Sequence, residues 1–272
     1  MATQTGTKKT AIAWGRMLVL VYGTFCYLIF LVTVLWAIGF VGNVFFPKTI
    51  DTGPRVSFIN AVLIDVLLLG LFALQHSVMA RLGFKQWWTR IIPSSIERST
   101  YVMVASLLLL LLYWQWLPLP GIIWNVEQTA GGVFLQALSW IGWLIVLLST
   151  FLINHFDLFG LRQVYLHWRG VEYTSMDMKT PALYKLVRHP LMLGFLIAFW
   201  ATPHMTVGHL LFSGVFTGYI LIGIYLEERD LLLAYGEAYR RYQQRVSLLL
   251  PVPKKQVILT ERRNETCHKN HP

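Results

Sequence analysis

Four clusters of polar residues interrupt an otherwise apolar sequence, and their side chains could transfer protons or bind a charged ligand. Histidine and carboxylate side chains can accept a proton from a substrate. Arginine can pair with a ligand carboxylate, and glutamate can pair with a ligand cation. The clusters contain Gln75 and His76; Asn154, His155, Asp157, Arg162 and Gln163; Arg188 and His189; and Glu227 and Glu228.

The rest of the sequence has the composition of a membrane protein. Hydrophobic residues make up 56% and charged residues only 13% of the 272 positions, so hydrocarbon is the preferred solvent of most of the chain. The two cysteines, Cys26 and Cys267, form no spacing framework for disulfides or zinc, and we expect no metal. The first apolar run, residues 17–40, is too long for a signal peptide core and is expected to be a retained span.

Further apolar runs predict the membrane helices that must position these clusters. A run of about 20 apolar residues crosses a bilayer, and we predict full spans at residues 17–40, 58–80, 100–117 and 132–153. A shorter run at 191–201 is followed by a break at Thr202-Pro203-His204 and a longer run at 208–226. Eleven helical residues extend about 17 Å, too short for a core of about 30 Å, so these two runs predict a helical hairpin. The expected fold class is all-α, a polytopic protein with five to six membrane helices.

The distribution of lysine and arginine predicts the orientation of the spans. Basic residues precede the first span and follow the second, whereas none lies between residues 117 and 132. Cytosolic loops carry the excess of Lys and Arg, so both termini are expected in the cytosol. The net charge of +10 then suits inner loops and anionic lipids rather than nucleic acid. All four polar clusters fall at cytosolic helix ends, which suggests one site.

Several polar residues also have a purely structural interpretation. Arg188 at a span boundary could set the topology and reach the headgroups, and Arg162 could be an ordinary inner-loop residue. His76 could be a buried histidine bonded to a neighbouring helix. Asp65, deeper in its span, is expected to form an interhelical hydrogen bond or to be a neutral acid, and we leave it out of the site.

The helix that contains Glu228 is predicted to continue past that residue as an amphipathic segment. Positions 228, 231, 235, 239, 242 and 246 form a stripe with helical spacing. Arg240, Arg241 and Arg245 lie mostly off this stripe. Such a segment could rest on the inner membrane surface with its tyrosines at headgroup level.

The hairpin and its extension carry a joint pattern of motifs. The pattern consists of Arg188-His189-Pro190 with Gly194, Glu227-Glu228 with Leu231, and then Gly236, Tyr239, Tyr242, Val246 and Pro251. It resembles the C-terminal signature of the isoprenylcysteine carboxyl methyltransferase-like membrane enzymes. The resemblance implies that residues 181–251 bind S-adenosylmethionine through His189, Glu228 and the aromatic stripe near Tyr239.

The chemistry of the residues agrees with this implication. Arg188 could bind the carboxylate of the cofactor, and Glu227 or Glu228 could bind its cationic end. Tyrosines such as Tyr184 and Tyr239 could stack on its adenine.

Upstream motifs narrow the resemblance. Met192 stands where the prenyl-protein enzymes usually have a tyrosine. Residues 74–81, 154–163 and 188–194 look instead like those of the bacterial methanethiol S-methyltransferases, and this closer match extends over most of residues 60–251. It implies methylation of methanethiol, a small volatile thiol, to dimethyl sulfide at the cytosolic boundary of the membrane.

Such a reaction mainly requires alignment of the reacting atoms and exclusion of water. The thiol must also lose its proton, because the thiolate is the stronger nucleophile. The candidate bases are His76, His155 and Asp157. Asp157 could pair with His155 if the chain bends after Ile153, or with His76 across two helices. The substrate-side candidates are Gln75, Asn154, Arg162 and Gln163.

Other functions stay open at this point. A group of membrane proteins associated with nitric-oxide and denitrification physiology shares features of the upstream motifs, and a small transporter would suit Asp65 and His76. The sequence has no internal repeat of the kind that transporters often show. A methyltransferase for another thiol or a lipid-like substrate would use the same motifs. In every case residues 1–180 would form the transmembrane bundle with the substrate-side motifs, and residues 252–272 a flexible basic tail.

Overall fold

The computed structural model describes residues 2–174 and 180–252, with side chains from residue 14 onward. Five helices are long and apolar enough to cross a membrane: α2, α4, α5, α9 and the part of α1 from Trp14 to Gly42. The predicted basic tail lies outside the described residues, except for Val252. In chain order the elements are α1 (Ala2–Gly42), α2 (Phe58–Ala80), α3 (Leu82–Trp88), α4 (Ser94–Gln115), β1 (Ile122–Asn125), α5 (Ala130–Ile153), α6 (His155–Leu158), α7 (Leu161–Arg169), the short 3-10 helix η1 (Ala182–Lys185), α8 (Pro190–Trp200), β2 (His204–Thr206), α9 (Val207–Tyr235) and α10 (Glu237–Arg245).

The predicted all-α membrane fold is confirmed. The spans expected at residues 58–80 and 132–153 correspond to α2 and α5, and the span expected at 100–117 corresponds to α4, which begins earlier, directly after Pro93. The hairpin is formed by α8 and α9, which end and begin on either side of Pro203. Pro190 occupies the first turn of α8, where its missing N–H would have no intrahelical partner.

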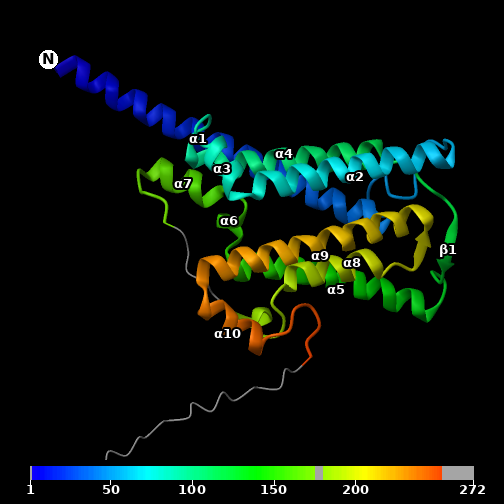
Figure 1. Ribbon diagram of the computed structural model, residues 1–272. Helices are drawn as coiled ribbons and strands as arrows, with labels where there is room; N and C mark the ends of the chain where they lie inside the picture. Colours follow the sequence, from blue (N-terminus) through cyan, green and yellow to red (C-terminus); the bar gives the residue numbers. More distant parts are fainter. Residues whose placement is uncertain (1, 175–179, 253–272) are drawn as a thin grey trace, which may run out of the picture.

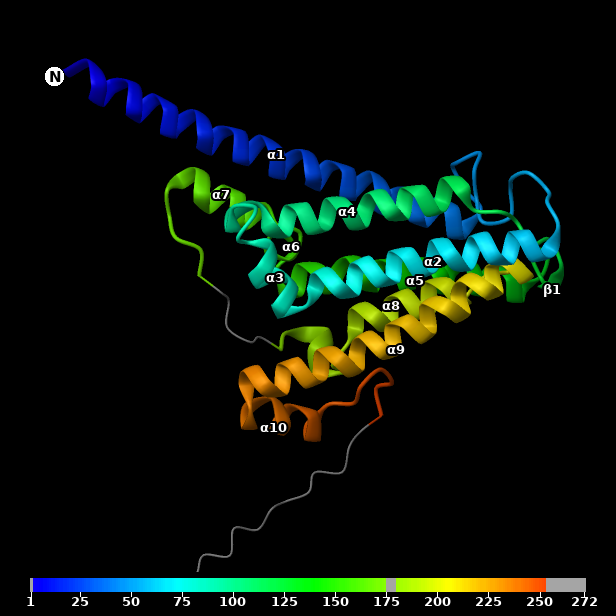
Figure 2. The ribbon, with the colours of Figure 1, turned by 45° about the horizontal axis from the view of Figure 1, so that its top comes forward.

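The long helices form two layers (Figures 1 and 2). One layer contains α1, α2 and α4, and the other contains α5, α8 and α9. A buried aromatic core joins them near the tip of the hairpin, where the ring of Phe212 lies 5.9 Å from Phe40 and 5.2 Å from Phe199. We call this the Pro203 end, and we call the opposite end, where α8 begins, the Arg188 end.

A short two-stranded sheet closes the Pro203 end and was not predicted. Strand β1 pairs antiparallel with β2, and the indole of Trp124 donates a hydrogen bond to the Thr202 carbonyl at 3.0 Å. The strands have three and four residues, too few for an alternating pattern to be recognised in a sequence. They fix the tip of the hairpin against the connection between α4 and α5.

Two glycines allow α5 and α8 to pack backbone against backbone. A β-carbon on Gly142 would lie 2.6 Å from the Ala198 nitrogen, and one on Gly194 would lie 2.8 Å from the Gly142 carbonyl oxygen. Small residues of this kind let membrane helices approach closely, where packing is the main attraction between them. This contact sets the position of α8, and therefore of the residues at its first turn.

The helix containing Glu228 does not continue unbroken to residue 246, and this part of the prediction was wrong. Gly236, with a φ of 51°, ends α9, and α10 folds back beside it. A positive φ is readily adopted by glycine because it has no β-carbon. The reversal brings residues of α10 level with Glu228.

Asp65 forms the interhelical contact expected of it. Its side chain is fully buried in α2, and its Oδ1 accepts a hydrogen bond from the Leu117 backbone nitrogen at 2.9 Å. The carboxyl group thereby satisfies a backbone donor just beyond the end of α4. It lies in the packed part of the bundle, which agrees with its exclusion from the predicted site.

We expect Gly194→Ala to destabilise the protein by about 1–3 kcal/mol, because overpacking of a tight contact costs free energy of this order. The new β-carbon would lie 2.8 Å from the Gly142 oxygen and from the Val146 nitrogen, which are backbone atoms. Thermal unfolding in detergent, followed by circular dichroism, measures the change. Gly218→Ala is the matched control, since a β-carbon there meets nothing within 4 Å. Equal melting temperatures for the two variants would contradict the close-packing argument.

Candidate functional site

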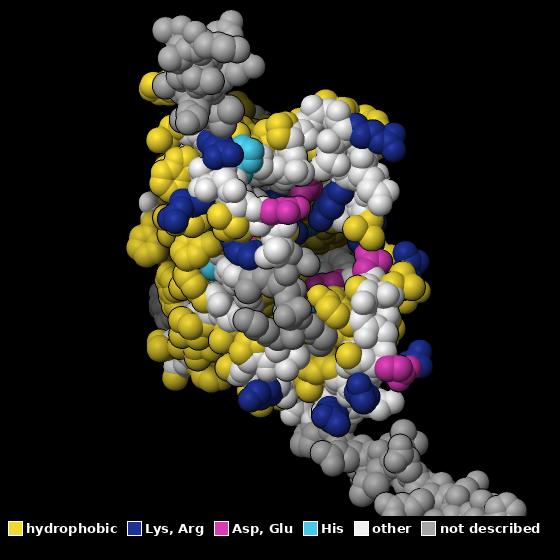
Figure 3. Space-filling view, turned by 90° about the vertical axis from the view of Figure 1, so that its left-hand side faces the viewer, with side chains coloured by type: hydrophobic (Ala, Val, Ile, Leu, Met, Phe, Trp, Pro, Cys, Tyr) yellow, Lys and Arg dark blue, Asp and Glu magenta, His cyan; other side chains and the backbone are white. Residues whose placement is uncertain are grey.

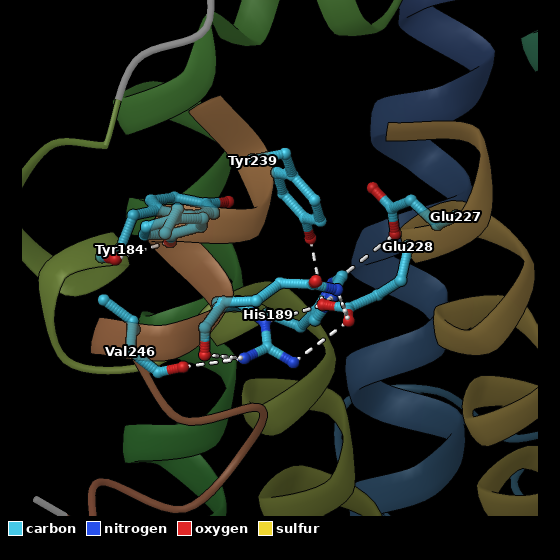
Figure 4. A network of polar contacts seen from close by, with 9 residues as sticks. Tyr184, His189, Glu227, Glu228, Tyr239 and Val246 are labelled. Carbon is cyan, nitrogen blue, oxygen red and sulfur yellow. Dashed lines mark hydrogen bonds and ion pairs between the residues drawn. The ribbon is translucent and has the colours of Figure 1, made fainter. Parts of the chain in front are cut away.

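The carboxylate of Glu228 is the centre of a buried polar network at the Arg188 end (Figure 4). Arg188 binds it with two nitrogens, Nε to Oε1 at 2.7 Å and Nη2 to Oε2 at 3.0 Å. Tyr239 donates its hydroxyl to Oε1 at 2.9 Å, and Gln243 donates its amide to Oε2 at 2.6 Å. His189 Nε2 lies 3.1 Å from Oε1. The network therefore joins the first turn of α8, α9 and α10.

Arg188 also binds the end of α10. Its Nη1 donates to the carbonyl oxygens of Gln243 at 3.1 Å and Val246 at 2.7 Å. The last carbonyls of a helix have no intrahelical donor, and the helix dipole favours a cation beside them. The backbone nitrogen of Arg188 donates in turn to the Ser247 carbonyl at 2.8 Å. The same residue thus fixes α10 through both its side chain and its backbone.

Burial and nearby charges shift the pKa values of the other groups around Glu228. Burial lowers the pKa of His189, but contacts with Glu227 and Glu228 outweigh this effect and leave the pKa raised. Burial raises the pKa of Tyr242 to about 12. Burial, reinforced by the Glu228 carboxylate, raises the pKa of Tyr239 as well. At neutral pH both tyrosines stay protonated and act as hydrogen-bond donors.

Glu227 is the carboxylate in this region that is left partly open to a ligand. Its side chain is 50% exposed, compared with 14% for Glu228, and its Oε2 lies 3.5 Å from His189 Nδ1. Tyr184 lies nearby on η1, and its carbonyl accepts the Tyr242 hydroxyl at 2.6 Å. Glu227 and the tyrosines thus provide a negative charge and aromatic surface in one place, which suits a cationic ligand with a ring.

A second polar group surrounds Asp157. Its Oδ1 accepts from Arg162 at 3.0 Å and from Gln163 at 3.3 Å, and its Oδ2 accepts from Tyr173 at 3.3 Å. The side-chain oxygen of Asn154 caps α6 by accepting the Asp157 backbone N–H at 3.2 Å. The four predicted residues of the 154–163 cluster other than His155 therefore do lie together.

This second group borders a pocket of about 300 Å³ between α4, α7 and residues 171–173. Gln163 and Tyr173 line the pocket, and Oε1 of Gln163 is buried without a hydrogen-bond partner among the described residues. Gly160, with a φ of 88°, lets α7 pass close to Ser99 on α4, where a β-carbon would lie 2.8 Å from the Ser99 nitrogen. Seen from the Arg188 end, the molecular surface is hollowed, with acidic and basic side chains around the hollow (Figure 3).

The two candidate histidines bind groups other than Asp157. His155 is buried, with Nε2 2.7 Å from the Tyr27 hydroxyl and Nδ1 2.8 Å from the Thr150 hydroxyl. Burial lowers its pKa, so the ring is neutral at pH 7. His76 Nε2 lies 2.9 Å from the hydroxyl of Tyr101. The geometry does not show the suggested pairing of Asp157 with either histidine.

The predicted residues other than His155, which contacts Tyr27 and Thr150, thus fall into three groups rather than one. Arg188, Glu228 and their neighbours form the first, Asp157 and its neighbours the second, and His76 the third, where Gln75 donates to Met79 Sδ at 2.9 Å. Gln75 Oε1 is buried without a partner in the described part of the chain. Within residues 14–174 and 180–252, no group of three His, Cys, Asp or Glu side chains could hold a metal ion.

Sequence reasoning missed several residues of these groups. Gln243 was missed because it lies off the helical stripe, and only the reversal at Gly236 brings it to Glu228. Tyr173 lies in an irregular segment with no periodic pattern, although its hydroxyl contacts Asp157. Tyr101 lies in the second turn of α4 after Glu97 and Arg98, and nothing in the sequence indicates that its hydroxyl faces His76 on another helix.

Comparison with known proteins gives extensive similarities. The family described as NnrU protein matches residues 64–253. A protein of Mycobacterium tuberculosis named methanethiol S-methyltransferase is 59% identical over 88% of this chain and 98% of its own length. A protein of Crocosphaera subtropica named methanethiol S-methyltransferase is 56% identical over 87% of this chain and 93% of its own length. A protein of Bradyrhizobium diazoefficiens named methanethiol S-methyltransferase 1 is 57% identical over 90% of this chain and 86% of its own length. No solved structure matches the chain.

We expect Arg188→Met to destabilise the protein by about 3 kcal/mol, because it leaves the largely buried Glu228 carboxylate without its cation. The double variant Arg188→Met, Glu228→Leu should recover much of this loss, since it removes both charges. Chemical denaturation in detergent measures both. Arg81→Met is the control: its ion pair with Asp230 is exposed, and its loss should cost less than about 1 kcal/mol. A double variant as unstable as the single one would contradict the ion-pair argument.

We also expect His189 to make stability depend on pH. Because its pKa is raised in the folded protein, its contribution is complete below about pH 6.5, the ordinary histidine value. The contribution is lost as the pH rises through the raised pKa. Melting temperatures of the wild type and His189→Asn between pH 6 and pH 9 measure the effect. The difference between them should shrink toward high pH, and a difference that does not vary with pH would rule out a charged His189.

Proposed function

The chain belongs to the NnrU protein family, and on this premise we propose that it methylates methanethiol to dimethyl sulfide, with S-adenosylmethionine as the methyl donor. The observation that carries the proposal is the identity of 56–59% to three proteins named methanethiol S-methyltransferase, over 87–90% of this chain. We infer that the reaction takes place at the Arg188 end, where the polar groups around Glu228 and Asp157 lie. The same proposal accounts for the enzyme's membrane helices, since methanethiol is a small volatile thiol that can partition into lipid.

The residues around Glu227 fit this cofactor. Arg188 and Glu228 largely neutralise each other, so the half-exposed Glu227 provides the negative charge for a cationic ligand. We infer that residues 181–251 form the cofactor-binding region, with Glu227, His189, Tyr184 and Tyr239 toward the ligand. Arg188 and Glu228 then support the wall of the site rather than bind the charged ends of the ligand directly.

When bound, S-adenosylmethionine supplies an electrophilic methyl group on a cationic sulfur. The protein must orient the thiol, exclude water and accept the thiol proton as the new carbon–sulfur bond forms. Of the three candidate bases we favour Asp157, because Gln163 and Tyr173, two of the side chains that bind its carboxylate, line the pocket. Arg162 and Gln163 hold the carboxylate in place, and Asn154 accepts the backbone N–H of the same residue.

His155 and His76 receive supporting roles in this proposal. Both ring nitrogens of His155 are engaged by Tyr27 and Thr150, and burial keeps the ring neutral. A base that acts through His155 would first have to break one of these contacts. His76 and Gln75 lie on α2, which contacts α9, and neither residue lines the pocket beside Asp157.

The apolar helices make the protein an integral membrane protein. We further infer that it lies in a bacterial inner membrane with the Arg188 end and both termini in the cytosol. Basic residues lie at that side: Arg16 near the start of the apolar part of α1, Arg98 near the start of α4, Arg90 after α3, Arg169 at the end of α7 and Lys185 at the end of η1. Residues 118–131, at the other side, contain neither lysine nor arginine. A site at this end takes a charged cofactor from water and a volatile thiol from lipid.

Headspace gas chromatography of the purified protein with S-adenosylmethionine and methanethiol tests the proposal. We expect dimethyl sulfide from the wild type, at least about tenfold less from Asp157→Asn, and a raised KM for the cofactor with Glu227→Gln. Glu127→Gln is the matched control, because it changes an exposed glutamate at the Pro203 end. Absence of dimethyl sulfide while the cofactor still binds would reject methanethiol as the substrate. Full activity in Asp157→Asn would remove Asp157 as the base.

A further inference from the structure

The outer side of α10 is strongly basic. Tyr239 faces inward and is buried, whereas Arg240, Arg241 and Arg245 are exposed. Arg240 is paired with Glu237 at 2.6 Å, and Glu237 is the only acidic residue of this helix. Among the described residues, Arg241 and Arg245 have no carboxylate within ion-pair distance. We call these three arginines the basic face of α10.

Apolar side chains are exposed beside the basic face. Leu250 and Val252, which follow α10, are 66% and 61% exposed, and Leu186, which precedes α8, is 58% exposed. The helix folds back along the outside of α9 rather than projecting away from the bundle (Figures 1 and 2). Arginines next to exposed aliphatic residues are typical of segments that lie in the membrane interface, with the cations among headgroups and the aliphatic groups in the acyl layer.

We propose that the basic face of α10 docks on anionic phospholipid headgroups of the cytosolic leaflet, and that this contact holds the cofactor site closed. Charge complementarity selects the lipid: three arginines and one paired acid favour an anionic surface over a zwitterionic one. The sequence continues this basic run with Lys254 and Lys255. The orientation used here and the effect on the cofactor rest on the proposed function.

The docked helix is also part of the site, and this couples the lipid to the cofactor. Tyr239 and Gln243 contribute two of the hydrogen bonds to Glu228, and Arg188 binds carbonyls at the end of the same helix. The following segment is tied to the first turn of α8, because the His189 nitrogen donates to the Leu248 carbonyl at 3.2 Å. Lipid that binds only the docked helix shifts the equilibrium toward the closed site.

Hydrogen–deuterium exchange of residues 237–248 tests the docking directly. The full chain is placed in nanodiscs of phosphatidylcholine alone, or of phosphatidylcholine with about one third phosphatidylglycerol. We expect at least about fivefold slower exchange in the anionic discs, since one basic residue near such a surface contributes about fivefold in affinity. The difference should disappear at a salt concentration of about 0.5 M, because salt at that concentration screens charges beyond a few ångströms. It should also disappear in Arg241→Gln, Arg245→Gln. Arg55→Gln, which changes an exposed arginine in the loop before α2, is the control and should retain the difference in exchange between the two lipids.

Affinity for S-adenosylmethionine, measured by equilibrium dialysis in the same nanodiscs, tests the coupling. We expect several-fold tighter binding with phosphatidylglycerol in the wild type and no lipid effect in Arg241→Gln, Arg245→Gln. Equal exchange of residues 237–248 in both lipids would overturn the docking, and lipid-dependent exchange with unchanged cofactor affinity would overturn the coupling. Lipid-dependent exchange in a protein that makes no dimethyl sulfide would leave the docking standing and reject the proposed function.

Discussion

The ion pair between Arg188 and Glu228 constrains how α8, α9 and α10 meet at the Arg188 end. Both side chains are removed from water, at 7% and 14% exposure, in a protein surrounded largely by hydrocarbon. Two charges in such a place are tolerated only if they are paired and their remaining hydrogen-bonding groups are satisfied. The carboxylate needs donors beyond the guanidinium, and the guanidinium needs acceptors beyond the carboxylate. No single helix can supply both sets, so three elements have to converge.

The reversal at Gly236 is what makes this convergence geometrically possible. In an uninterrupted helix, Glu228 and Tyr239 would be separated by about 16 Å along the axis, far beyond the reach of a tyrosine hydroxyl. Because α10 folds back, the Tyr239 hydroxyl lies 2.9 Å from Glu228 Oε1. The reversal also turns the carbonyls at the end of α10 toward Arg188. The guanidinium therefore caps α10 while it neutralises α9. Because these charges satisfy each other, the site depends on Glu227 for its net negative charge.

The sequence predicts this architecture as far as its signals are periodic or local. Long apolar runs located the spans, and the short run before Pro203 identified the hairpin. The hairpin brings Arg188 and Glu228 to the same end of the bundle, as expected, but they bind each other rather than the two ends of a ligand. The reversal was missed because a glycine at position 236 is compatible with either a continuous helix or a helix end, and only its φ distinguishes them. The contact of Asp157 with Tyr173 was missed because Tyr173 lies in an irregular segment, whereas Arg162 and Gln163, which also bind Asp157, were among the predicted residues. Side-chain partners across helices depend on rotation and depth, which a hydrophobic pattern does not encode.

The two ends of the bundle differ in what their side chains do: one end is packed with aromatic rings, and the other contains the buried polar network. At the Pro203 end, aromatic rings of both layers interlock, and the buried Asp65 satisfies a backbone donor beyond α4. The Arg188 end is polar and hollowed instead. Under the proposed function, this opening admits a charged cofactor from water and an apolar thiol from lipid. Polar contacts also occur at the Pro203 end, where Thr206 binds Asp51, but the groups around Glu228 and Asp157 both lie at the hollowed end, so the proposed substrate pair accounts for their placement as much as the fold does.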